Sequence, residues 1–343
     1  MANELEGIHL EVLNDYLHAH IDGFEGIQHM AAFEAGQSNP TYVIQTSGKK
    51  YVLRRKPSGQ LLPSAHAVDR EFRVMSGLAK ANFPVPKMYL YAAESDAVET
   101  PFFVMDFVEG RVFDNVQMPQ LTPDERKQVF EAMVQTMAKL HAIVPDDVGL
   151  GDFGKQGNYF TRQIGRWSKQ YKASETDKIP EMDKLIDWLP QNIPADDETR
   201  VIHGDFGMHN LMFHPTEARI VAVLDWELST LGHPIADLTY NMLPWYTPSL
   251  AKRPSFQGLD FAAHGIPSFD NYMKRYCELT GRDPIENPSF YRAYNLFRFA
   301  AIAQGIVARA IQGNASNPRA MEMRQVVAPL AQLGWMEAQK TGA

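Results

Sequence analysis

The pattern of apolar and polar positions divides the chain into a strand-rich first part and a helix-rich remainder. Short runs of alternating apolar and polar residues predict strands, and apolar residues at every third or fourth position predict helices. In the first part these patterns predict a helix at 8–17, strands at 41–46 and 50–55, a helix beginning at Ser64, and strands at 88–92 and 102–107. One helix inserted into a run of antiparallel strands indicates a small unit that ends near residue 106.

The second part is predicted to be mostly helical, with short strands near its middle. Thr122 and Glu125 flank Pro123 in a capping-box sequence, which predicts the start of a long helix. The other expected elements are strands at 201–203, 211–213 and 220–226 and helices at 268–280, 289–312 and 318–339. We therefore expect an α+β, bilobal fold, with an N-terminal lobe at 1–106 and a helical lobe at 107–343.

Composition and charge narrow the class of protein. The 343 residues are 45% hydrophobic and 22% charged, as in ordinary globular proteins. The formal net charge is −8 and no run of Lys and Arg offers a phosphate-tracking surface, which argues against a nucleic-acid partner. The single cysteine, Cys277, cannot form an intramolecular disulfide. The N-terminus lacks a signal-peptide pattern and the apolar stretch 299–311 is too short to span a membrane, so we expect a cytoplasmic protein.

Two loops carry the strongest chemical signal. The segment 203–210 reads His-Gly-Asp-Phe-Gly-Met-His-Asn, and 224–227 reads Leu-Asp-Trp-Glu at the end of an apolar strand. Phosphoryl transfer needs a carboxylate that orients the attacking hydroxyl, oxygen ligands for Mg²⁺, and positive charge at the transferring group. Asp205 suits the first role, and Asn210 and Asp225 suit the second.

Glu227 is a candidate ligand of a second metal ion in the same loop. Asp and Asn in loops also cap ordinary turns, so neither loop alone would carry the argument. Both loops together, in this order and each at a strand end, favour a catalytic role over the capping of ordinary turns. His203 and His209 lack the ligand spacing of zinc sites, so hydrogen-bonding roles are expected for both.

These motifs resemble those of the aminoglycoside phosphotransferase and choline kinase family, a branch of the protein-kinase-like fold. The resemblance runs from about residue 28 to about 335 and is strongest to kinase-like domains that, in longer proteins, are fused to acyl-CoA dehydrogenases. It implies Mg²⁺-dependent transfer of phosphate from ATP or GTP to a hydroxyl group. It also implies that Asp237 and His203 support the catalytic loop.

By the same resemblance, the N-terminal lobe is expected to bind the nucleotide. The segment 35–41 corresponds to the phosphate-covering loop, with Ser38 and Asn39 as candidate contacts. Val52 and Arg54 share a strand face, as a base-contacting apolar residue and a phosphate-binding cation should. Lys56 falls on the same face, so the choice between the two cations stays open.

The helix and the last strand of this lobe supply the remaining candidates. Glu71 is expected to pair with the phosphate-binding cation, and an exposed charge at a helix edge is the alternative. The segment 102–110 resembles the hinge between the lobes, with Met105, Asp106 and Val108 at the nucleotide base. A buried edge strand is the competing interpretation of this segment.

The motifs do not identify the molecule that accepts the phosphate. The resemblance hints at an anionic hydroxyacyl or acyl-thioester compound. Arg298 and Arg309 lie near one face of a late helix and are candidate contacts, with surface salt bridges as the alternative. The leading hypothesis is a small-molecule kinase. The alternatives are a nucleotide-binding pseudokinase or regulatory module, an aminoglycoside kinase, and a protein kinase, which the lack of an activation segment ending in Ala-Pro-Glu disfavours.

Overall fold

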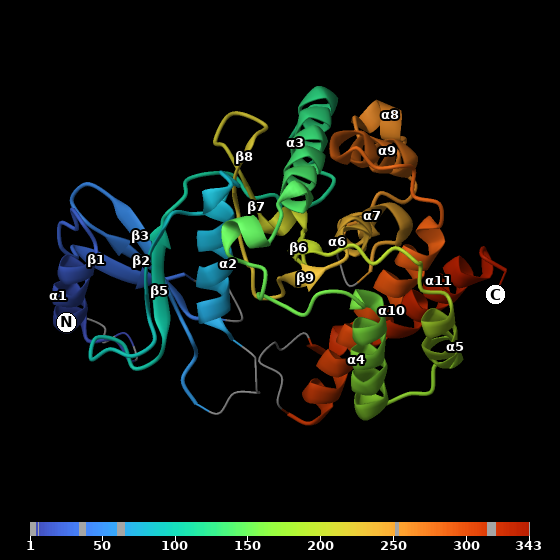
Figure 1. Ribbon diagram of the computed structural model, residues 1–343, viewed down its shortest axis with the longest axis horizontal. Helices are drawn as coiled ribbons and strands as arrows, with labels where there is room; N and C mark the ends of the chain where they lie inside the picture. Colours follow the sequence, from blue (N-terminus) through green and yellow to red (C-terminus); the bar gives the residue numbers. More distant parts are fainter. Residues whose placement is uncertain are drawn as a thin grey trace.

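The protein has a strand-rich lobe beside a larger helical lobe, with the two chain ends on opposite sides of the molecule (Figure 1). The computed structural model describes residues 5, 7–33, 39–59, 66–250, 254–313 and 320–342. The predicted α+β, bilobal fold is therefore confirmed. The last strand of the small sheet ends at Asp106, where we predicted the boundary between the lobes.

The N-terminal lobe is a five-stranded antiparallel sheet with one helix on each face. Its strands, in the order β1-β2-β3-β5-β4, are β1 (His29–Ala32), β2 (Thr41–Gln45), β3 (Lys50–Arg55), β5 (Phe102–Asp106) and β4 (Met88–Ala92). Side chains alternate between the two faces of a strand. Phe102 and Val104 therefore pack with α1 (Leu10–His20), whereas Phe103 packs with α2 (Val68–Lys80).

The C-terminal lobe is built around the long helix α10, against which α4, α6 and α11 pack. The helices are α3 (Pro123–Ala142), α4 (Tyr159–Ser174), α5 (Pro180–Trp188), α6 (Pro234–Asn241), α7 (Leu243–Tyr246), α8 (Phe261–His264), α9 (Phe269–Thr280), α10 (Pro288–Ile311) and α11 (Arg324–Gln339). Short 3₁₀ turns lie at Asp146–Val148, Leu189–Gln191, Met208–Asn210 and Ala320–Met323. Within the described ranges, no helix is long and apolar enough to cross a membrane.

Two short antiparallel sheets carry the motif loops. Strand β6 (Arg200–Ile202) pairs with β9 (Thr230–Gly232), and β7 (Leu211–Phe213) pairs with β8 (Ile220–Val223). The loop 203–210 connects β6 to β7, and the loop after β8 leads into β9. Each loop therefore joins one small sheet to the other, which places the two motifs side by side.

Several predicted elements differ at their ends. The strand predicted at 220–226 ends at Val223, because Asp225 takes a left-handed φ of 62° that a strand cannot continue. The helix predicted at 318–339 begins as an α-helix only at Arg324. Helix α2 begins at Val68, and Ser64, where we placed its start, lies outside the described residues.

Candidate active site

The loop 203–210, the candidate catalytic loop, contains near its start a glycine that no other residue would replace easily. Gly204 has a φ of 82°, and a Cβ atom there would lie 2.7 Å from the carbonyl oxygen of Leu228. The carboxylate of Asp237 accepts hydrogen bonds from the backbone N–H groups of His203 at 2.8 Å and Gly204 at 2.9 Å. The start of α6 therefore fixes the backbone immediately before Asp205.

A buried chain of side chains extends from Asp237 to two other helices. His141 on α3 places Nε2 at 3.4 Å from the Asp237 carboxylate and Nδ1 at 2.8 Å from the Tyr276 hydroxyl of α9. Burial alone would raise the pKa of Asp237, but the hydrogen bond and charge of His141, together with His203, outweigh burial and lower the pKa. Sequence reasoning missed His141 and Tyr276, although a histidine next to the apolar stripe of α3 was a signal.

Asp205 is held by its own loop. The Asn210 side-chain amide donates to the Asp205 carbonyl at 2.9 Å and to carboxylate oxygen Oδ2 at 3.2 Å. His209 places Nε2 at 3.5 Å from the same oxygen. Burial would raise the pKa of Asp205, but His209, the charge of His203 and a hydrogen bond from Tyr240 lower it. Asp205 is therefore ionised at neutral pH and can accept a hydrogen bond from a hydroxyl group.

The segment 224–227, the candidate metal loop, is tied to the candidate catalytic loop by two hydrogen bonds. His203 Nε2 donates to the Leu224 carbonyl at 2.9 Å, and the Leu224 N–H donates to the Asn210 carbonyl at 2.9 Å. The indole of Trp226 packs against the His203 ring, with 4.6 Å between ring centroids. Together these contacts bring Asn210 and Asp225 to one place, as the motif spacing predicted.

Arg54 connects the two lobes at this place. Its Nε lies 3.2 Å from the Glu71 carboxylate and its Nη2 lies 3.3 Å from Asp225. Glu71 is buried, so the exposed helix-edge alternative is wrong. Burial raises the pKa of Glu71 to about 7, which Arg54 opposes and the negative charges of Asp225 and Glu227 reinforce. Of the two candidate cations, Arg54 is the one that contacts Glu71, whereas Lys56 follows the last residue of β3.

The candidate phosphate loop is described only in part. Ser38 lies outside the described residues. Asn39 is buried, donates to the Glu71 carboxylate at 2.9 Å and meets His66 Nδ1 at 2.9 Å. Asn39 thus supports Glu71, a contact that the sequence did not reveal.

The hinge candidates lie at the end of an inner strand. Strand β5 pairs with β3 on one side and β4 on the other, so the edge-strand alternative is wrong. Val52 is buried and lies opposite Met105 in this register. The Asp106 carboxylate lies 2.6 Å from Lys49 and accepts a hydrogen bond from Tyr89. The Asp106 side chain is therefore engaged within the N-terminal lobe.

The residue set fits Mg²⁺ bound together with phosphate oxygens. No three His, Cys, Asp or Glu side chains form a metal-holding cluster in the part of the chain that is described. Mg²⁺ commonly takes one or two protein oxygens and completes its octahedron with phosphates and water. Asn210 and Asp225 supply two such oxygens, and the guanidinium of Arg54 beside Asp225 shows that a positive charge is accommodated there.

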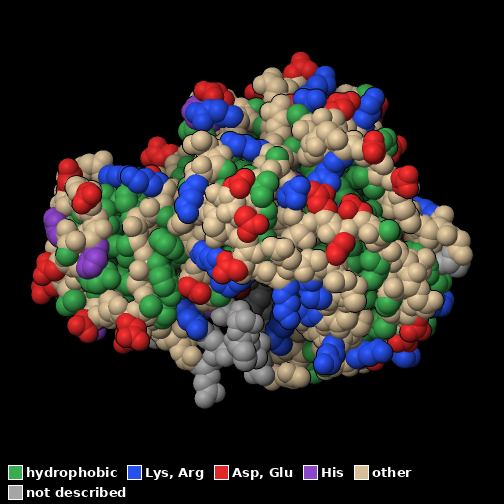
Figure 2. All heavy atoms as spheres, in the orientation of Figure 1, with side chains coloured by type: hydrophobic (Ala, Val, Ile, Leu, Met, Phe, Trp, Pro, Cys, Tyr) green, Lys and Arg blue, Asp and Glu red, His purple; other side chains and the backbone are tan. Residues whose placement is uncertain are grey.

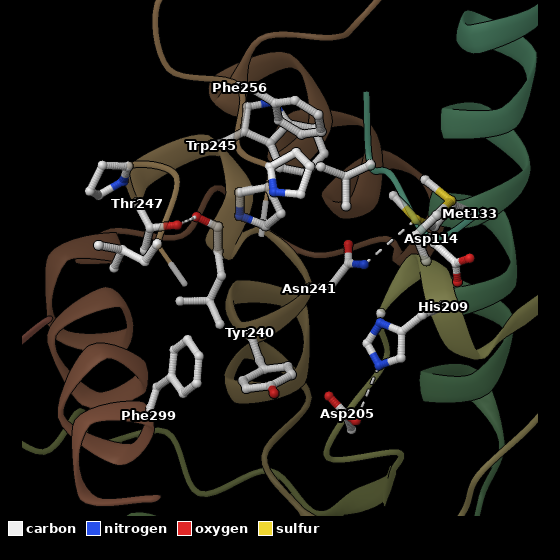
Figure 3. A pocket seen from close by; sticks show the side chains of 18 of the residues that line it. Asp114, Met133, Asp205, His209, Tyr240, Asn241, Trp245, Thr247, Phe256 and Phe299 are labelled. Carbon is white, nitrogen blue, oxygen red and sulfur yellow. Dashed lines mark hydrogen bonds and ion pairs between the residues drawn. The ribbon is translucent and has the colours of Figure 1, made fainter. Parts of the chain in front are cut away.

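A cavity of about 340 Å³ opens beside Asp205 (Figure 3). Its walls are mostly apolar and include Val116, Phe130, Met133, Trp245, Phe256 and Phe299. Among the residues that the structure describes, its ionisable lining residues are Asp114, Asp205, His209 and Tyr240, and none is Lys or Arg. Asn241 also reaches the wall, but its amide donates to the Phe206 carbonyl at 2.8 Å and accepts from Tyr272 at 3.0 Å. The cavity therefore combines apolar walls with a few ionisable side chains, among them Asp205.

The two predicted acceptor contacts lie elsewhere. Arg298 is buried, and its Nη2 donates to the Gly204 carbonyl at 2.8 Å. Arg309 is exposed and eleven residues later, which is about 16 Å farther along the helix axis. Neither lines the cavity. Figure 2 shows basic side chains gathered beside the hollow near the middle of the molecule, where the surface turns inward.

Comparison with known proteins identifies the family. The profile of the phosphotransferase enzyme family matches residues 29–265, which is more than half of the chain. This chain belongs to that family. This phosphotransferase is 43% identical over 318 residues to mouse acyl-CoA dehydrogenase family member 10. The matched residues cover 92% of this chain and 30% of that protein. Human acyl-CoA dehydrogenase family member 11 is 40% identical over 335 residues, covering 96% and 43%. The chain thus spans less than half the length of these curated relatives.

Solved structures agree with this assignment. A Ralstonia eutropha protein, named provisionally as an aminoglycoside phosphotransferase, is 44% identical with a TM-score of 0.90, covering 97% of this chain and 99% of its own. A spectinomycin phosphotransferase solved with ADP and spectinomycin has a TM-score of 0.62 at 13% identity, covering 97% and 99%, and shows the fold alone. The resemblance inferred from the sequence motifs is therefore confirmed.

Proposed function

We propose that this phosphotransferase is a Mg²⁺-dependent small-molecule kinase that moves the γ-phosphate of ATP or GTP to a hydroxyl group. The observation that carries the proposal is the junction of the two motif loops. Asn210 holds Asp205 through its side chain and Leu224 of the metal loop through its backbone. An acceptor-orienting carboxylate and the metal ligands are thus held as one unit, as in-line transfer requires.

In this mechanism Asp205 acts on the acceptor. Its carboxylate is ionised and faces the cavity, so it can accept the hydrogen bond of the attacking hydroxyl and take its proton. Mg²⁺, when bound with the nucleotide, would offset the charge of the phosphate oxygens. Asn210 and Asp225 would hold it, with Glu227 as the candidate for a second ion. Arg54, placed by Glu71, adds positive charge at the phosphates.

The nucleotide is proposed to lie between the lobes. Val52 would contact the base, and the hinge backbone from Met105 to Val108 would hydrogen-bond to its edge. Ser38 and Asn39 belong to the proposed phosphate-covering loop, Asn39 by supporting Glu71. The related spectinomycin enzyme was solved with ADP, which supports a nucleotide donor in this family.

The acceptor is proposed to be a hydroxyacyl compound with an apolar chain. The cavity beside Asp205 offers apolar walls to a chain, whereas a buried carboxylate would meet no Lys or Arg among the described residues of its lining. Any anionic or thioester end is therefore proposed to lie outside these described walls. The curated relatives named as acyl-CoA dehydrogenase family members support an acyl compound as the acceptor.

The test combines one substitution with a panel of acceptors. Hydroxy acids of increasing chain length, their thioesters, and amino sugars are incubated with MgATP or MgGTP, and transfer of labelled γ-phosphate is measured. Transfer to the hydroxyacyl members is expected, and Asp205→Ala should lower it by roughly two to four orders of magnitude while nucleotide affinity stays within about twofold. Turnover of amino sugars alone would contradict the acceptor class. Near-full activity of Asp205→Ala would contradict the mechanism, and nucleotide binding without any transfer would favour a pseudokinase.

A further inference from the structure

The acceptor side of Asp205 is formed by a tyrosine of α6. Tyr240 comes three residues after Asp237, so both side chains lie on one face of the helix. Asp237 fixes the backbone before Asp205, whereas Tyr240 lines the same cavity as the Asp205 carboxylate. Figure 3 shows the Tyr240 ring beside Asp205, with its phenol oxygen on the side of the carboxylate.

The Tyr240 ring is backed by a buried cation. The Arg298 guanidinium lies 4.8 Å from the centroid of the Tyr240 ring, and the same group donates to the Gly204 carbonyl at 2.8 Å. A cation over an aromatic face is attracted to the ring, and its charge makes a phenol a stronger hydrogen-bond donor. Arg298 therefore holds both the loop backbone and the ring that faces Asp205.

The other contacts of the Asp205 carboxylate come from one side. Asn210 and His209 both approach oxygen Oδ2, at 3.2 and 3.5 Å. These two contacts come from the loop itself and approach the same one of the two carboxylate oxygens. A hydrogen bond from Tyr240 also contributes to the lowered pKa of Asp205, which agrees with a donor on the cavity side.

We propose that Tyr240, backed by Arg298, is a positioning residue that donates a hydrogen bond to Asp205 and fixes the carboxylate oxygen that meets the acceptor. This inference rests on the proposed function, because it assigns Tyr240 a role only if Asp205 orients the nucleophile. It also gives Arg298 a role in place of the acceptor contact that the sequence suggested.

The experiment uses the full chain with MgATP and water as the acceptor, followed as single-turnover release of labelled γ-phosphate. Tyr240→Phe removes only the hydroxyl. Its turnover rate is expected to fall about tenfold, the effect of one hydrogen bond to a charged group, with MgATP affinity unchanged within about twofold. The control is Tyr246→Phe, which removes a hydroxyl that donates to the Thr239 carbonyl at 2.6 Å and does not line the cavity. It should turn over like the wild type.

Four outcomes decide the matter. A rate within twofold of the wild type for Tyr240→Phe overturns the inference. So does a tenfold loss matched by an equal loss of MgATP affinity, because a displaced α6 would disturb the whole site. Asp205→Asn with the wild-type rate would instead contradict the proposed function. A lost Asp205→Asn rate with an intact Tyr240→Phe rate contradicts only the inference.

Discussion

Replacing Asp237 by alanine should destabilise the fold by an amount that the structure allows to be worked out. Its buried carboxylate accepts from two backbone N–H groups, at 2.8 and 2.9 Å. Alanine leaves both donors buried without that partner, and each such loss costs about 1–3 kcal/mol. The expected loss is therefore about 2–6 kcal/mol. Because domains are stable by only about 5–15 kcal/mol, this is a large share of the total.

Urea unfolding followed by circular dichroism would measure this loss. Asp237→Asn retains one carbonyl acceptor, so it should lose less than the alanine variant. The matched control is Asp124→Ala, an 84% exposed carboxylate paired with Lys127, which should change the free energy of unfolding by no more than about 0.5 kcal/mol. If Asp237→Ala lies within about 1 kcal/mol of the wild type, the carboxylate does not brace the loop.

The same residue gives a pH dependence of known sign. The pKa of Asp237 is lowered in the folded protein. Its contribution is therefore complete above the ordinary carboxyl pKa and is lost as the pH falls through the lowered folded-state pKa. The stability difference between the wild type and Asp237→Ala should shrink on acidification, and a difference that grows at low pH would contradict the argument.

Three further predictions concern the site. Asp225→Ala and Asn210→Ala should each lose at least about tenfold in Mg²⁺-dependent nucleotide affinity by calorimetry, and unchanged affinity in both would place the metal elsewhere. Without nucleotide, Glu71 stabilises the fold below its ordinary pKa of 4.5 and loses that contribution as the pH rises through about 7. In urea unfolding, Glu71→Gln should therefore show a smaller change of unfolding free energy with pH over this range. An equal change in both proteins would contradict the raised pKa of Glu71. His209→Gln should raise the pKa of Asp205 and move the acid limb of MgATP turnover to higher pH, whereas an unmoved limb would exclude the contact.

The parts of the fold that the sequence predicted are those set by local pattern. The capping box at Thr122 opens α3, with the Glu125 N–H donating to the Thr122 hydroxyl at 3.3 Å. Strand β2 alternates between half-buried and buried positions, and the motif loops follow strand ends. The family resemblance also led us to expect that Glu71 pairs with the phosphate-binding cation, and Arg54 is the residue that contacts it.

The parts that the sequence did not predict depend on contacts between distant segments. Asn39 gave no sign that it would be buried on Glu71, because 32 residues separate them. Asp225 was placed in a strand, although its left-handed φ ends the strand two residues earlier. The position of Arg298 on its helix suggested a contact with the acceptor, but its guanidinium donates a hydrogen bond to the Gly204 carbonyl, 94 residues away in sequence. No local pattern shows which distant segment the side chain of a buried arginine contacts.

The position of α6 links the reaction to acceptor selection. Helix α10 holds α6 through Asn295, whose amide donates to the Ala236 carbonyl at 3.0 Å and the Thr239 hydroxyl at 2.8 Å. One turn later on α10, Arg298 holds the catalytic loop itself. The end of α6 supplies Asn241 to the cavity wall, while its beginning anchors the backbone before Asp205. A change of wall residue that moves α6 therefore also moves the carboxylate, so acceptor specificity should show in the turnover rate as well as in acceptor affinity.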